Sequence, residues 1–137
     1  VSPMSHRIVV VTGASGAIGT SIRRAFAALD EVVIGLDLRP TIDGMGEVLS
    51  CDVADDTSVT EAFTTVLERH GRVDVLVNCA GMTGAGGVLE ESPDQWRRIL
   101  EVNLTSAYLC TRCVIPSFAC SRARKRVRVS NPPLLAA

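Results

Sequence analysis

The chain has 137 residues, 47% of them apolar and 21% charged, which fits one small globular domain or part of a larger one and excludes an intrinsically disordered protein. No apolar run approaches the roughly 18 residues that a membrane span needs, and no charged-then-apolar leader opens the chain, so we expect a soluble, cytoplasmic protein. Residues 1–101 contain eight Arg and all 15 acidic residues, a net charge of −7, whereas residues 102–137 contain five Arg, the one Lys and no acid, a net charge of +6.

Apolar runs alternate with helical patterns along the chain. Continuous apolar runs predict buried strands over residues 8–11, 32–36, 48–50 and 73–77. Apolar residues spaced three and four apart predict helices over residues 18–29, 55–70 and 103–118, and another that begins at Ser92-Pro93. Ser58 and Glu61 have the spacing of a capping box. The alternation predicts an α/β fold: a doubly wound, Rossmann-like parallel sheet, incomplete, with about four strands and with helices on both faces.

The five cysteines do not suggest a disulfide framework, because their number is odd. Cys110 and Cys113 have the C-x-x-C spacing of a redox pair or half a zinc site, but no second C-x-x-C exists and no His lies near them in the sequence. Both fall inside a helical apolar pattern, where Cys packs as a small apolar residue. We therefore expect no metal.

The segment after Cys120 differs from the rest. Residues 121–129 contain five cations, and Asn131-Pro132-Pro133 breaks regular structure. We divide the chain into a Rossmann-like half domain over residues 1–120 and a basic, disordered tail over residues 121–137, although Val127 and Val129 alternate with Arg and allow a short edge strand. The tail could bind nucleic acid or an acidic partner, but a charge run without aromatic residues is more typical of a solvated tail, so we expect no nucleic-acid partner.

Three glycines follow the first predicted strand and precede an amphipathic helix. Gly13 can form the tight turn, Gly16 can let a phosphate approach the backbone, and Gly19 can let the helix pack on the strand. The helix N-terminus supplies free N–H groups and a positive dipole end to the same phosphate. Asp37 ends the second strand, where a carboxylate can accept hydrogen bonds from ribose hydroxyls. By itself, Asp37 fits a solvated turn equally well.

The combined motifs resemble those of the short-chain dehydrogenase/reductase family. The residues from Thr12 to Gly19 (T-G-A-S-G-A-I-G) are similar to the family motif T-G-x-x-x-G-x-G, with Gly16 one position before the motif's middle glycine, and the family's acid after strand two matches Asp37. Its N-N-A-G motif matches residues 78–81, with Cys79 in place of the second Asn. The remaining matches are the Asp-Val pair at Asp52 and Val53 and the active-site Asn at Asn103. The resemblance covers residues 7 to about 119, roughly the first half of a typical member.

The resemblance implies a role for each matching residue. Asp52 and Val53 would flank the adenine ring, and Ala80 and Gly81 would line the nicotinamide ribose. Asn78 would tie the strands together, and Asn103 would hold a water molecule of the family's proton relay. The implied cofactor contacts also include Ser15, Ile18, Leu38 and Asn78.

NAD is the cofactor that we expect. The 2′-phosphate of NADP would be repelled by Asp37, and members that prefer NADP usually place a cation nearby. Ala14, Ser15 and Leu38 are uncharged here, and Arg39 lies further along the chain, where we expect it to be solvated. The substrate of full-length relatives would be a secondary alcohol or ketone, contacted by Met82, Thr83 and the glycines up to Gly87.

The family's Ser, Tyr and Lys are not found in this sequence at the family's positions. Tyr108 is the one tyrosine, Arg112 stands where Y-x-x-x-K would require Lys, and Lys125 lies 17 residues away. We therefore expect Tyr108 to pack in a helix and the chain alone to be inactive, as a shortened or frame-shifted member would be. The strand at 73–77 would then be an exposed edge that favours aggregation. The family resemblance implies a homo-oligomer, an expectation that the shortened chain weakens.

Alternative functions follow from the same motifs. A non-catalytic dinucleotide-binding module or fragment is the main one. A methyltransferase also uses glycines and an acid after strand two, but the N-x-A-G motif and Asn103 argue against it. A P-loop enzyme is excluded because no Gly-Lys-Ser/Thr follows the glycines.

Overall fold

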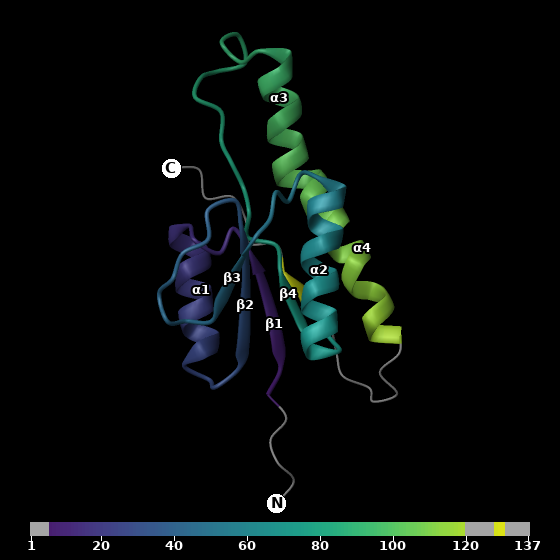
Figure 1. Ribbon diagram of the computed structural model, residues 1–137. Coiled ribbons are helices and arrows are strands. Elements are labelled where there is room, and N and C mark those ends of the chain that lie inside the picture. The colour runs from purple at the N-terminus through teal and green to yellow at the C-terminus, as the bar shows by residue number, and fades with distance from the viewer. Residues whose placement is uncertain (1–5, 120–127, 131–137) are drawn as a thin grey trace, which may run out of the picture.

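The computed structural model describes residues 6–119 and 128–130. Strands and helices alternate along the chain (Figure 1). The strands are β1 (Ile8–Thr12), β2 (Val32–Asp37), β3 (Glu47–Ser50), β4 (Val75–Val77) and β5 (Arg128–Ser130). The helices are α1 (Ala17–Ala27), α2 (Asp56–His70), α3 (Pro93–Leu100), the π-helix η1 (Glu101–Thr105) and α4 (Ser106–Ala119).

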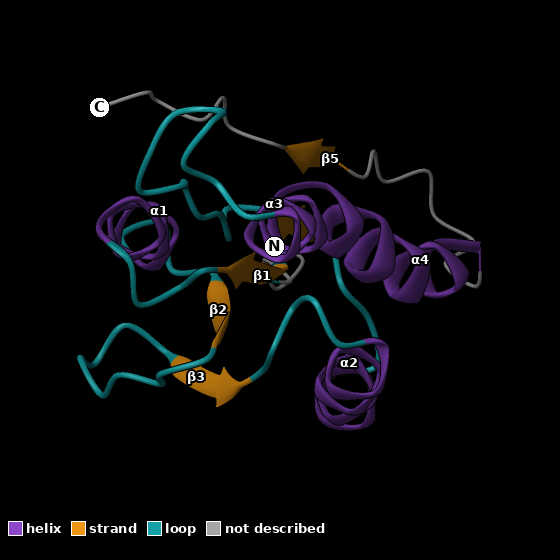
Figure 2. Cartoon of the chain, turned by 90° about the horizontal axis from the view of Figure 1, so that it is seen from above, coloured by secondary structure: helices purple, strands orange, loops and turns teal. Residues whose placement is uncertain are grey.

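The strands form one parallel sheet in the order β3-β2-β1-β4-β5. Val9 of β1 pairs with Val33 of β2 on one side and with Val75 of β4 on the other. Helix α1 covers one face of the sheet, while α2 and α4 cover the other (Figure 2). The predicted doubly wound α/β fold is therefore confirmed.

Successive side chains of β1 enter two different core layers, because side chains alternate across a strand. Val9 and Val11 pack with Ile22 and Phe26 of α1. Ile8 and Val10 belong to the larger layer, which α2 and α4 complete with the buried residues Val59, Ala62, Phe63, Val66, Leu109, Cys110 and Val114. A strand covered on both faces needs apolar residues at every position, which explains the unbroken apolar run of β1.

The sequence had led us to expect that the sheet ends at β4, but the structure contains a fifth strand. Residues 128–130 form β5, which pairs in parallel with β4 in the register Val75↔Arg128. The prediction of an exposed edge at β4 is therefore wrong, and the short edge strand that the alternating valines allowed is present. Of the predicted basic tail, residues 121–127 and 131–137 lie outside the described residues.

The helix boundaries follow local capping, with one difference from expectation. Asp55 caps α2 by accepting a hydrogen bond from Ser58 N at 2.8 Å, whereas the Ser58 hydroxyl accepts from Asp52 N at 3.0 Å. Asp55 therefore caps α2 in place of the expected capping box of Ser58 and Glu61. Ser92 caps α3 as expected and accepts from Gln95 N at 3.1 Å. Among the described residues, no helix is long and apolar enough to cross a membrane.

The C-x-x-C pair lies in α4, in contact with the core. Cys110 is completely buried, and Cys113 packs against the same layer. Burial raises the pKa of the Cys110 thiol to about 12. The packing role expected for these cysteines is therefore confirmed.

Candidate functional site

The glycine loop between β1 and α1 is shaped by two close backbone contacts. Gly13 has φ +62°, and a Cβ there would lie 2.7 Å from Ala80 Cα. A Cβ at Gly19 would lie 2.1 Å from Gly13 O. By contrast, a Cβ at Gly16 would meet only Gly13 O, at 3.4 Å, and Gly16 caps α1 without a side-chain hydrogen bond. The protein itself therefore requires glycine at positions 13 and 19, while Gly16 leaves open space at a helix N-terminus, where an anion binds well.

Asp37, the last residue of β2, accepts hydrogen bonds from the glycine loop and from the loop that follows β2. Its Oδ2 accepts from Ser15 N at 2.9 Å, and its Oδ1 accepts from Arg39 N at 2.9 Å. The Ser15 hydroxyl in turn donates to Arg39 O at 2.8 Å. The carboxylate is therefore fixed in position, and each oxygen keeps a lone pair for a further donor.

Arg23 supports the same region and was not identified from the sequence. Its side chain is fully buried in α1, its Nε donates to Ala14 O at 3.0 Å, and its guanidinium pairs with Asp43. The hydrogen bonds from Arg23 hold the pKa of Asp43 below its usual range. The signal in the sequence was a charged residue four positions after Gly19, on the helix face that packs against the sheet.

A cleft of about 340 Å³ lies beyond the carboxyl ends of β1, β2 and β4. This is where open parallel sheets bind ligands. Seven of the predicted cofactor contacts line it: Gly13, Asp37, Leu38, Asp52, Val53, Ala80 and Gly81. Ser15, Gly16, Ile18, Gly19, Asn78 and Asn103 are not part of its lining.

Arg98 also lines this cleft, and nothing in the sequence pointed to it. It lies on α3, and its Nη2 donates to both carboxylate oxygens of Asp52, at 3.3 Å to Oδ1 and 3.1 Å to Oδ2. The two residues are 46 positions apart in the chain. The ion pair therefore places a guanidinium next to Asp52 in the wall of the cleft.

The two asparagines behave differently. Asn103 clamps the backbone of Met82: its Oδ1 accepts from Met82 N and its Nδ2 donates to Met82 O, both at 2.8 Å. It lies in the π-helix η1, a local irregularity often found at functional sites. Asn78 was expected to tie strands together, but neither polar atom of its side chain has a hydrogen-bond partner among the described residues. Thr12 makes that link instead, because its Oγ1 accepts from Cys79 N and Ala80 N, both at 3.0 Å.

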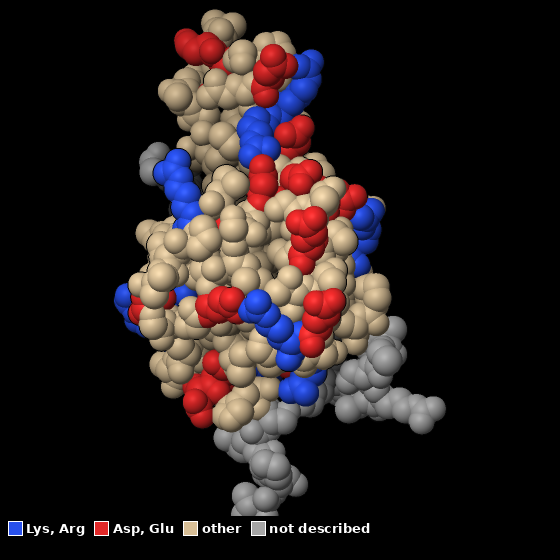
Figure 3. All heavy atoms as spheres, in the orientation of Figure 1, with Lys and Arg blue, Asp and Glu red and all other residues tan. Residues whose placement is uncertain are grey.

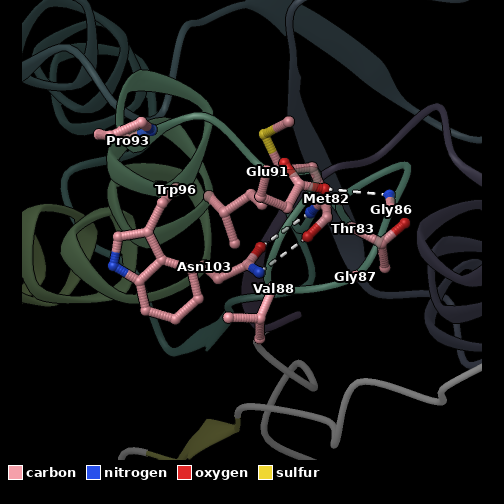
Figure 4. Close-up of a pocket in the computed structure, with 11 residues that line it drawn as sticks. Met82, Thr83, Gly86, Gly87, Val88, Glu91, Pro93, Trp96 and Asn103 are labelled. Atoms are coloured by element: carbon pink, nitrogen blue, oxygen red, sulfur yellow. Dashed lines mark hydrogen bonds between the residues drawn. The ribbon is translucent and has the colours of Figure 1, made fainter.

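A second, larger cavity of about 670 Å³ lies between α3 and the loop after β4 (Figure 4). Its lining is mostly apolar and consists of Met82, Thr83, Gly84, Gly86, Gly87, Val88, Glu91, Pro93, Trp96, Ile99 and Asn103. Glu91 holds the loop in shape, since its Oε1 accepts from Gly86 N at 3.2 Å. The residues expected to contact substrate, Met82, Thr83 and glycines of this loop, are part of this lining. We call this cavity the apolar pocket.

Tyr108 lies away from both cavities. Its side chain is 61% exposed, and the Arg112 guanidinium carbon is 5.9 Å from the centroid of its ring. Arg112 also pairs with Asp56 of α2, with its Nη2 at 2.7 Å from Asp56 Oδ1. Arg112 therefore links α4 to α2, while Tyr108 contacts Arg112 within α4. Lys125 lies outside the described residues.

Charges on the face that Figure 3 shows are mixed, with acidic and basic side chains interspersed over its helices. Within the part of the chain that the structure describes, this face has no basic patch of the kind that binds a phosphate backbone. The cations at residues 122–126 lie outside the described residues.

Comparisons with known proteins agree with this architecture. The chain is 34% identical over 120 residues to meso-2,3-butanediol dehydrogenase of Serratia marcescens, covering 81% of the chain and 48% of that enzyme. The ligand-free aldohexose dehydrogenase of Thermoplasma acidophilum matches with a TM-score of 0.83 and 31% identity, over 90% of the chain and 48% of that structure. A 3-ketoacyl-(acyl-carrier-protein) reductase of Brucella melitensis, solved with NADH, matches with a TM-score of 0.77 and 26% identity, over 85% of the chain and 52% of that structure.

These matches also show how much of a relative the chain represents: it spans about half the length of the curated relatives it matches. The family model described as short chain dehydrogenase matches residues 7–130, so the similarity continues past residue 120 and includes β5. The chain belongs to the short-chain dehydrogenase family.

Proposed function

We propose that the chain binds NAD(H) in the cleft beyond β1, β2 and β4. The observation that carries the proposal is the fixed carboxylate of Asp37, held by Ser15 N and Arg39 N in the wall of the cleft. A fixed acceptor at the end of the second strand suits the two hydroxyls of a ribose. Titration of the chain with NADH, followed by NADH fluorescence, tests this: saturable binding is expected, and its absence would overturn the proposal.

The residues around the cleft fit the parts of a dinucleotide. The open space at Gly16 and the uncapped N-terminus of α1 suit the pyrophosphate. Asp52 and Val53 would lie at the adenine, with Ala80 and Gly81 at the nicotinamide ribose. Ser15, Ile18 and Leu38 would border the adenosine half.

Asp37 would also favour NAD over NADP. A 2′-phosphate beside this carboxylate would meet like-charge repulsion, and Leu38, which is 60% exposed, offers no compensating cation. Replacing Asp37→Ala together with Leu38→Arg should shift the ratio of NADPH to NADH affinity toward NADPH. Asp94→Ala, which removes an exposed carboxylate of α3, is the matched control and should leave the ratio unchanged. An unchanged ratio in the double variant would contradict the preference.

In a protein that includes the second half of the family's domain, we propose that this site supports oxidation of a secondary alcohol or reduction of a ketone. Bound NAD(H) supplies the hydride acceptor or donor. The apolar pocket would receive the carbon skeleton of the substrate, because its lining is mostly apolar and it adjoins the cleft at Met82, which lines both cavities. Asn103 would fix this shared wall through Met82 and position a water molecule for proton transfer.

A second candidate is a dinucleotide-binding module without catalysis, which the position of Tyr108 favours. It is the one tyrosine of the chain and lines neither cavity. We therefore expect the 137-residue chain to bind NADH but not to turn over NAD with a panel of secondary alcohols. Turnover above that of an Asn103→Ala chain would contradict the non-catalytic candidate, and binding without turnover would support it.

A further inference from the structure

The ion pair between Arg98 and Asp52 connects the wall of the cleft to the helix that lines the apolar pocket. Arg98 is 41% exposed and lines the cleft, while the helix that carries it, α3, also lines the apolar pocket. We propose that Arg98 is a positioning residue that couples the adenosine end of the cleft to the apolar pocket through α3. This inference rests on the proposed function, since it takes Asp52 as part of the nucleotide site.

The Asp52 carboxylate is held at one end and open at the other. Its Oδ1 accepts from Ala54 N at 3.0 Å and from Arg98, whereas its Oδ2 accepts from Arg98 alone among the described residues. A carboxylate has about four lone-pair sites, so Oδ2 can accept another hydrogen bond, for example from the amino group of an adenine. The charge-assisted bonds from Arg98 hold the carboxylate in one orientation for that donor.

Helix α3 presents different residues to the two cavities. Arg98 faces the cleft, while Trp96 and Ile99 face the apolar pocket. No residue of α3 is buried, and the other ion pairs of its arginines run to Asp94 and Glu101, within the same helical segment. In the part of the chain that the structure describes, Arg98–Asp52 is thus the ion pair that attaches α3 to the sheet domain, by which we mean the strands together with α1, α2 and α4.

A ligand that binds Asp52 therefore acts on the attachment of α3 and, through it, on the wall of the apolar pocket. Coupling of this kind is reciprocal, because a ligand in the pocket must then change affinity at the adenosine end by the same factor. Trp96 is the one tryptophan of the chain and reports on this wall directly.

The experiment uses ADP-ribose with the 137-residue chain, because this probe has the adenosine half of the cofactor and lacks nicotinamide. Binding should change the emission of Trp96. In Arg98→Met, ADP-ribose should bind about three- to tenfold more weakly, as expected for one lost half-exposed charged contact, and saturation should no longer change the emission. Reduced nicotinamide mononucleotide should bind both chains equally, which a general loss of structure would not allow. Arg98→Lys should recover part of the affinity.

Arg97→Met is the matched control, since it removes the same charge from the same helix and its partner Asp94 is 93% exposed. It should behave as the unchanged chain does. If Arg98→Met and Arg97→Met give equal affinities and equal emission changes, the inference is wrong and the proposed function stands. If the unchanged chain binds neither ADP-ribose nor NADH, the proposed function fails and the inference fails with it. Should Arg98→Met not fold, Asp52→Asn replaces it, and an emission change that survives that substitution overturns the coupling.

Discussion

The sheet domain and the region around α3 differ in how far they are packed. In the sheet domain Val9, Val10, Val11 and Leu36 are completely buried between helices. In α3 no residue is buried, and Trp96 is 56% exposed. Figure 1 shows α3 and the loop before it extending beyond the ends of the strands. The domain that holds the cleft is thus packed by its own residues, whereas the α3 region is shaped by a few polar contacts.

This contrast separates stability from ligand binding. Substitutions in the sheet domain should change mainly the free energy of unfolding, and substitutions around α3 should change mainly what the cavities bind.

The largest difference should come from truncating one aromatic residue in each region. Phe63 is 1% exposed in the core, so Phe63→Ala should lower the free energy of unfolding by about 3–5 kcal/mol. Trp96→Ala removes a half-exposed ring and should cost less than about 1 kcal/mol. Urea unfolding followed by circular dichroism measures both. Similar losses for the two variants would mean that the regions are equally packed.

Replacing either of two glycines of one loop with alanine should change the stability of the fold in opposite directions. Gly19→Ala forces a Cβ against Gly13 O and should destabilise the fold by about 1–3 kcal/mol. Gly16→Ala fits the backbone of that residue and should stabilise the fold by about 0.4–1 kcal/mol while weakening NADH binding, because its methyl group enters the space for the phosphate. Gly16→Ala with unchanged NADH affinity would contradict the placement of the pyrophosphate.

Buried thiols should make the sheet domain sensitive to alkaline pH. Burial raises the pKa of Cys51 to about 11 and that of Cys110 to about 12, from an ordinary value near 9. Below pH 9 both states keep the protons, so stability is unaffected. Above pH 9 the unfolded chain loses these protons while the folded chain keeps them, so the free energy of unfolding should fall as the pH rises from about 9 to 11.

Thermal unfolding between pH 7 and pH 11 measures this slope. A Cys110→Ala chain should show a shallower slope, because one of the thiols with a raised pKa is gone. An equal slope in both chains would assign the alkaline loss to other groups.

The smallest effect on stability should come from the exposed apolar residues of the η1–α4 segment. Leu104 and Ile115 are 67% and 56% exposed, so replacing both with Gln should change the free energy of unfolding by no more than about 0.5 kcal/mol per site. The doubly substituted chain should remain monomeric to higher concentration, since an exposed apolar surface promotes association. Sedimentation velocity over a concentration series tests this, and a loss of stability comparable to that of Phe63→Ala would contradict it.

Local patterns were enough to predict the elements of the sheet domain. The apolar run of β1, the glycine positions and the Ser92 cap each depend on residues a few positions apart, and all three appear in the structure as expected. Asp37 could be identified because its position relative to the glycines is fixed by one strand and one helix.

Contacts between distant residues could not be predicted in the same way. Asp52 and Arg98 are 46 positions apart, and Arg23 meets Asp43 across 20 positions, so no local spacing indicates either pair. The edge strand β5 is three residues long and follows a basic run, which weakens every periodic signal. The π-helix η1 also has no signature in the sequence, because helical spacing continues across residues 93–119.

The strand order has a consequence for how the chain folds during synthesis. β1 is synthesised before the other strands but lies in the middle of the sheet, where it pairs with β2 along one of its own edges and with β4 along the other. About 60 residues separate β1 from β4, so at the usual 5–20 residues per second a ribosome needs roughly 3–12 s to supply the second partner. During that interval the unpaired backbone edge of β1, an apolar strand, can pair with another nascent chain. For this topology, the rate of translation therefore sets how long the central strand remains open to misassembly.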